Sequence, residues 1–111
     1  MNDCLSWRTK QNSQKNRFKY STGVSFLHES KKFEICFCLS LLDLDYYCEA
    51  IFANKKGRAD IYVPEKDVAI EVLNTEEEAD FEKKKDYYPC RVVRVSVLDK
   101  IDTDYLLRLV N

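Results

Sequence analysis

Two carboxylates, Asp60 and Glu71, are spaced so that they could hold a divalent metal ion. They lie in two segments typical of β-strands, 58–63 and 68–73, which the loop 64–67 separates. A four-residue loop between antiparallel strands places Asp60 directly opposite Glu71, with β-carbons about 5 Å apart, where like charges repel. A cation between them would relieve this repulsion, and carboxylate oxygens are ligands that Mg²⁺ and Mn²⁺ prefer. The spacing therefore predicts a metal site of the kind used for phosphodiester hydrolysis.

A third acidic group could join this site, but a simpler interpretation competes with it. Glu49 lies in the preceding strand-like segment 46–53. If a turn at 54–57 follows, Glu49 lies opposite Tyr62 and shares the face of the two carboxylates. The spacing supports equally well an alternative in which these carboxylates face solvent and Arg58 neutralises them.

The only histidine, His28, lies at the start of a predicted helix, where we expect it to be partly exposed. One histidine without a matching cysteine or serine gives little support to nucleophilic catalysis of the Cys-His or Ser-His-Asp type. Five cysteines without a C-x-x-C pair fit buried, reduced thiols better than a zinc or iron–sulfur site. No apolar segment reaches the roughly 20 residues that span a bilayer, and the first residues do not have the pattern that predicts a signal peptide. We therefore expect an intracellular, cytoplasmic protein with no membrane segment.

Helices and strands of one α/β domain must position these residues. Ser25 could cap a helix over 26–44. Its buried face is expected to consist of residues that recur at the helical period: Phe33, Cys36, Phe37, Ser40, Leu41 and Leu44. Further elements are predicted at 46–53, 58–63 and 68–73 (strands), about 75–87 (helix), 91–97 (strand) and 103–110 (helix). This order predicts a mixed sheet of about four strands flanked by helices, in which the last strand runs parallel to the one before it.

Length and composition agree with a single domain. The chain has 111 residues, of which 45% are hydrophobic and 33% are charged. Only two glycines are present, so a glycine-rich phosphate loop, and with it a P-loop or dinucleotide-binding fold, is excluded.

The charge is uneven, and this separates a basic leader, residues 1–22, from the domain at 23–111. The leader has five basic residues and one acidic residue, a net charge of +4, whereas the whole chain has −1. Interspersed aromatic residues could stack on bases while the basic side chains contact phosphates. The alternative is a solvated, partly ordered terminus. The candidate nucleic-acid-binding residues are Arg8, Lys10, Lys15, Arg17 and Lys19.

The two central strands resemble the PD-(D/E)XK superfamily of restriction-endonuclease-like nucleases. The runs GRADIYV (57–63) and VAIEV (68–72) carry the resemblance, together with the α-β-β-β-α-β order over about 26–97. The chain is most similar to small members of the resolvase, competence-protein and mobile-element types. The resemblance implies a restriction-endonuclease-like αβββαβ core and hydrolysis of DNA with Mg²⁺ or Mn²⁺. It also implies that a metal is bound by Asp60, by Glu71 and by the backbone carbonyl of Val72.

Two further acids are candidate metal ligands, and one family residue is missing. Glu29 matches in position a helix acid that some members add, and Glu49 competes with it. The family's lysine two residues after the second acid is Leu73 here. Arg58, or a lysine of the following helix such as Lys83 or Lys84, could supply the missing charge. The candidate catalytic residues are therefore Asp60, Glu71, Arg58 and Lys83.

The interpretation as an enzyme has an alternative and a corollary. Leu73 favours a catalytically inactive nuclease-fold module that binds nucleic acid or another protein. Arginine stays protonated, so Arg58 could orient a phosphate but could not act as a base. Cleavage of both strands of a duplex needs two sites, so a nuclease this small is expected to be a homodimer.

Overall fold

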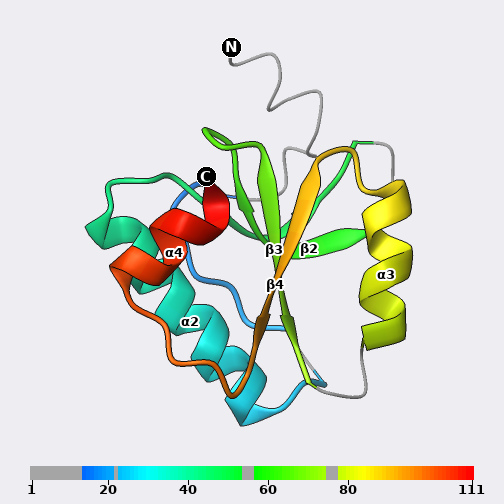
Figure 1. The fold of residues 1–111 in the computed structure, drawn as a ribbon, viewed down its shortest axis with the longest axis horizontal. Helices are drawn as coiled ribbons and strands as arrows, with labels where there is room; N and C mark the ends of the chain where they lie inside the picture. The colour runs from blue at the N-terminus through cyan, green and yellow to red at the C-terminus, as the bar shows by residue number, and fades with distance from the viewer. Residues whose placement is uncertain (1–13, 22, 54–56, 75–77) are drawn as a thin grey trace.

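The computed structural model describes residues 14–21, 23–53, 57–74 and 78–111, which form an α/β domain (Figure 1). Four strands make one mixed sheet in the order β1-β2-β3-β4. Helices α2 and α4 cover one face of the sheet and helix α3 covers the other. The elements are α2 (Phe26–Leu41), β1 (Tyr47–Ile51), β2 (Arg58–Val63), β3 (Val68–Leu73), α3 (Glu78–Tyr87), β4 (Arg91–Ser96) and α4 (Thr103–Val110). The predicted fold class, a mixed four-stranded sheet flanked by helices, is confirmed.

The central hairpin has the predicted register. Strands β2 and β3 are antiparallel, with Ile61 paired to Ile70 and Val63 to Val68. Strand β4 runs parallel to β3, as predicted, and α3 belongs to the crossover connection that parallel neighbours need. Every residue of β3 is buried, because helices cover both faces of the sheet.

The first hairpin departs from the predicted register by two residues. Tyr47, and not Glu49, pairs with Tyr62, and the last recorded pair joins Ile51 to Arg58. The Phe52 N–H donates to the Gly57 carbonyl at 3.5 Å, which continues this register one pair beyond Ile51 and Arg58. The Phe52 ring packs in the core, 4.7 Å from that of Tyr88 and 6.0 Å from that of Tyr62. The shift brings Glu49 to the level of Asp60. Most of the predicted turn at 54–57 lies outside the described residues, as do residues 75–77 of the predicted capping box.

Helix α2 begins where the sequence predicts, but its buried face is different. The Ser25 hydroxyl accepts a hydrogen bond from the His28 backbone N–H at 3.1 Å and caps the helix. The helix ends at Leu41, three residues early, and Asp43 has a left-handed φ of 60°. Of the predicted face, only Cys36 and Leu44 are buried; Phe33, Ser40, Phe37 and Leu41 are exposed. The helix instead buries His28, Glu29, Lys32, Ile35, Cys36, Cys38 and Leu39. The periodicity was ambiguous because α2 is apolar on two opposite sides, and only packing against the sheet selects one of them.

Two apolar clusters lie on opposite faces of the sheet. The larger joins the sheet to α2 and α4, and it includes the buried thiols of Cys36 and Cys48, whose sulfur atoms are 3.3 Å apart. The smaller contains Phe52, Tyr62 and Tyr88. Within the described part of the chain, no helix is long and apolar enough to cross a membrane.

Residues 14–21 of the predicted leader pack against the domain. Lys15 bridges to Tyr47 at the edge of β1, and the Asn16 N–H donates to the Tyr46 carbonyl at 2.8 Å. Phe18 packs against the larger cluster. This segment therefore runs along the outer edge of the sheet, which would otherwise expose unpaired backbone groups.

Candidate active site

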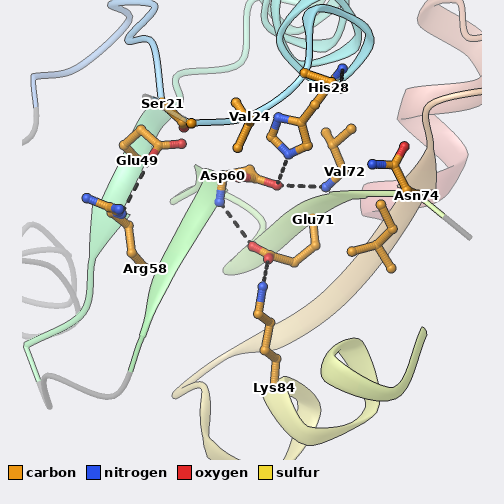
Figure 2. Close-up of a pocket in the computed structure, with 13 residues that line it drawn as sticks. Ser21, Val24, His28, Glu49, Arg58, Asp60, Glu71, Val72, Asn74 and Lys84 are labelled. Carbon is orange, nitrogen blue, oxygen red and sulfur yellow. Dashed lines mark hydrogen bonds and ion pairs between the residues drawn. The ribbon is translucent and has the colours of Figure 1, made fainter. Parts of the chain in front are cut away.

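A cavity of about 410 Å³ lies where α2, α3 and the first three strands meet (Figure 2). Its polar lining residues include both carboxylates of the predicted metal site, Asp60 and Glu71. The remaining lining residues are Ser21, Gly23, Val24, Ser25, His28, Glu49, Arg58, Val72, Leu73, Asn74 and Lys84.

Asp60 and Glu71 lie side by side, as the register predicts, and each is fixed by a backbone N–H of the other strand. The Asp60 N–H donates to Glu71 Oε2 at 3.0 Å, and the Val72 N–H donates to Asp60 Oδ2 at 2.8 Å. Recorded pairing of β2 with β3 runs from Val63–Val68 only to Ile61–Ile70. At the next position, the backbone N–H groups of Asp60 and Val72 donate to the carboxylates of Glu71 and Asp60. Both side chains are therefore held in place where the recorded strand pairing ends.

Lys84 of α3 provides the cation next to Glu71. Its Nζ lies 2.6 Å from Glu71 Oε1, and Glu71 is 1% exposed. Burial raises the pKa of Glu71 to about 7, and the Asp60 charge adds to this effect while Lys84 opposes it. Burial alone would lower the pKa of Lys84, but Glu71 and Asp60 outweigh it and the net shift is upward. Lys84 is therefore a protonated cation, whereas its neighbour Lys83 is exposed.

His28 of α2 provides the cation next to Asp60. Its Nε2 lies 3.3 Å from Asp60 Oδ2 and its Nδ1 lies 2.9 Å from Glu29 Oε2. The hydrogen bond to Asp60 raises the pKa of His28 to about 9, although burial opposes the shift. The expectation of a partly exposed histidine is wrong, since His28 is 7% exposed. We expected a metal to relieve the repulsion between Asp60 and Glu71. Two side-chain cations, one from each helical layer, relieve it instead.

A buried lysine holds the two other candidate metal ligands. Lys32 is fully buried, and its Nζ lies 3.0 Å from both Glu29 Oε1 and Glu49 Oε2. Lys32 Nζ also donates to the Ser21 hydroxyl oxygen at 3.0 Å, and Arg58 Nε lies 3.3 Å from Glu49 Oε1. Burial would raise the pKa of Glu29, but the Ser21 N–H, His28 and Lys32 together lower it. Glu49 and Arg58 line the cavity, whereas Glu29 does not.

The donors present suit a hard divalent cation. Within the described residues, Oδ1 of Asp60 makes no hydrogen bond or ion pair, and each oxygen of Glu71 accepts one partner. No three His, Cys, Asp or Glu side chains converge on a point that could hold a metal in this part of the chain. A metal would therefore depend on Asp60, Glu71, a backbone oxygen such as that of Val72, and water. That ligand set is compatible with Mg²⁺, which usually keeps several waters.

The basic residues of the leader lie away from the cavity wall. Lys15 pairs with Asp45 at 3.7 Å, and Arg17 and Lys19 are exposed. Arg8 and Lys10 lie outside the described residues. None of the three described cations lines the cavity, but the segment that carries them leads to Ser21, which does.

The contacts of His28 and Lys32 are features that sequence reasoning missed, and for the helix lysine it named both Lys83 and Lys84 but chose Lys83 as the catalytic candidate. Lys32 lies three residues after Glu29 and four after His28, so the three side chains are neighbours on α2, and this spacing was a signal for a polar cluster. Lys84 could not be separated from Lys83 without knowing how α3 is rotated against the sheet.

No protein-family model matches the sequence, and no curated protein or solved structure shows significant similarity to it. The geometry of the cavity is therefore the basis for a functional conclusion.

Proposed function

We propose that the protein is a metal-dependent DNA endonuclease of the PD-(D/E)XK type with a restriction-endonuclease-like core. The contact between Lys84 and Glu71, 2.6 Å long and beside Asp60, carries this proposal. Leu73 occupies the position of the family's lysine, and helix α3 brings a cation to the same carboxylate from outside the strand. In this proposal, Lys84 of helix α3 replaces the lysine that is missing from the strand.

Asp60, Glu71 and the Val72 carbonyl would hold Mg²⁺ or Mn²⁺. The bound ion would polarise the scissile phosphate and activate the attacking water. His28 and the Val72 N–H fix Oδ2 of Asp60, which leaves Oδ1 available for coordination. These bonds hold the carboxylate in one orientation before substrate arrives, which lowers the cost of reorganisation.

Lys84 and Arg58 would act on the phosphate as cations. The raised pKa of Lys84 keeps it protonated, so it stabilises developing negative charge and does not remove a proton. The Arg58 side chain is 58% exposed at the cavity border, where its guanidinium could bind a neighbouring phosphate. Arg17 and Lys19 would extend this contact along the DNA backbone.

A second candidate function is a nuclease-fold module that binds nucleic acid or protein without cleaving. The observation in its favour is that Glu71 and Asp60 already have a cation each, in Lys84 and His28. Such a site is charge-balanced without a metal.

Nicking of supercoiled DNA in Mn²⁺ separates the two. We expect the wild type to nick, EDTA to stop it, and Asp60→Asn to lower the rate at least about 100-fold. Asp104→Asn is the matched control, because Asp104 is an exposed residue of α4. A folded wild type that neither nicks DNA nor binds Mn²⁺ in calorimetry would favour the non-catalytic module.

A further inference from the structure

Helix α2 carries an exposed apolar stripe on the side opposite its buried face. Residues 26, 30, 33, 37 and 41 recur at the spacing of one helical face. Apart from Ser30 they are large and apolar, and Phe26, Phe33, Phe37 and Leu41 are exposed at 83, 54, 56 and 64%. A helix that is apolar on two sides is usually covered on both.

The stripe continues onto the N-terminal segment. The Phe18 ring lies 5.4 Å from that of Phe33 and 5.5 Å from that of Tyr20, edge to face in both cases. Tyr20 is itself 75% exposed. A hollow of about 360 Å³ lies among Phe18, Tyr20, Phe26, Phe33 and their polar neighbours Glu29 and Ser30. The surface is therefore continuous and not flat, so a complementary side chain could insert into it.

The exposed area is close to what a protein interface requires. An aromatic side chain has about 200 Å² of surface, so the rings of Tyr20, Phe26, Phe33 and Phe37 leave about 500 Å² open before Leu41 is counted. Monomers seldom expose a larger apolar patch. A stable interface takes about 800 Å² from each partner, polar rim included.

We propose that this stripe is a self-association surface, on which a second copy of the chain packs α2 against α2 about a two-fold axis. Around such an axis each patch meets its own copy, so an uncharged patch is self-complementary whereas a charged one repels itself. The stripe contains no charged residue. On its flank, Lys31 and Glu34 already pair within one chain at 2.8 Å. Ser30 provides a small side chain between Phe26 and Phe33, where two helices can approach closely.

The same helix reaches the candidate active site, because Ser25 and His28 line the cavity. Packing of α2 against α2 would connect two cavities through one pair of helices, which is the arrangement that cleavage of both DNA strands needs. This consequence rests on the proposed nuclease function, but the surface itself does not.

Sedimentation velocity over micromolar to millimolar concentrations tests the proposal. We expect the wild type to reach the mass of two chains and Phe37→Glu to stay at the mass of one, with an unchanged circular dichroism spectrum. Leu98→Glu is the matched control, because Leu98 is 74% exposed outside α2, and we expect it to dimerise like the wild type. If Phe37→Glu does not fold, Phe26→Glu replaces it, since an acidic residue in the first turn of a helix is favourable.

A wild type that stays at the mass of one chain at millimolar concentration would overturn the proposal. If that monomer binds neutral phosphatidylcholine vesicles, the stripe is a lipid-binding surface and the proposal is equally overturned. So would a stripe variant that dimerises as well as Leu98→Glu. A dimeric wild type that does not cleave DNA would contradict the nuclease proposal and support this one.

Discussion

Carboxylates removed from water destabilise the folded state unless cations compensate their charge. In the cavity, His28 pairs with Asp60 and Lys84 pairs with Glu71. Each cation comes from a different helical layer, so the charge balance also connects both layers to the sheet. A metal that enters must share Glu71 with Lys84, because Lys84 already occupies one side of that carboxylate. The two cations therefore control both the stability of the site and its affinity for metal.

His28 should make folding stability depend on pH. Its pKa in the folded protein, about 9, lies above the ordinary histidine pKa of 6.5, because Asp60 and Glu29 stabilise the charged ring. The contribution is fully present below pH 6.5 and is lost as the pH rises through about 9. We expect the free energy of unfolding to fall over this range by up to about 3 kcal/mol.

Urea unfolding of the wild type and His28→Gln between about pH 6 and pH 10 measures this contribution. The raised pKa of Glu71 changes stability in the same direction at lower pH, so the difference between the two proteins is the informative quantity. Parallel curves for wild type and variant would show that His28 is not the group responsible.

At the scale of elements, Lys32 is the buried connection between α2 and β1. It joins Glu29 of its own helix to Glu49 of the strand. We expect Lys32→Met to cost about 3–5 kcal/mol of stability, because removing one partner leaves buried charge uncompensated. Lys85→Met is the control, since Lys85 makes an exposed pair at 3.7 Å that contributes less than about 1 kcal/mol. Equal urea midpoints for the two variants would contradict a structural role for Lys32.

The elements also differ in how far sequence alone determines them. A four-residue loop fixes the register of β2 with β3, so the proximity of Asp60 and Glu71 followed from spacing. The register of β1 with β2 did not follow, because pairing joins Phe52 and not Ala53 to the residues after the turn, and the aromatic packing of Phe52 against Tyr88 cannot be read from spacing. The rotation of α2 and α3 about their axes also depends on tertiary packing. This is why the exposed stripe, His28 and the choice of Lys84 over Lys83 emerged only in the folded domain.

For the whole molecule, the charge distribution predicts how DNA should bind. Arg17 and Lys19 are exposed beside β1 and can be changed without disturbing Phe18, whose ring packs on the domain. We expect the double variant Arg17→Gln/Lys19→Gln to bind DNA more weakly, with a salt dependence reduced by up to about two phosphate contacts. Fluorescence anisotropy over a salt series measures the slope. Lys66→Gln/Lys85→Gln is a charge-matched control. If the affinity of the two double variants depends on salt with the same slope, the leader does not contact DNA.

The central claim is that a helix lysine replaces the lysine missing at Leu73. The direct measurement is the rate of Mn²⁺-dependent nicking by the wild type, Lys84→Met and Lys83→Met, together with the Mn²⁺ affinity of each. Removing one charge that stabilises the transition state costs about 100- to 1,000-fold in rate. We therefore predict that loss for Lys84→Met, with Mn²⁺ affinity unchanged or higher because the competitor for Glu71 is gone, and wild-type behaviour for Lys83→Met. Nicking by Lys84→Met at the wild-type rate would contradict the account.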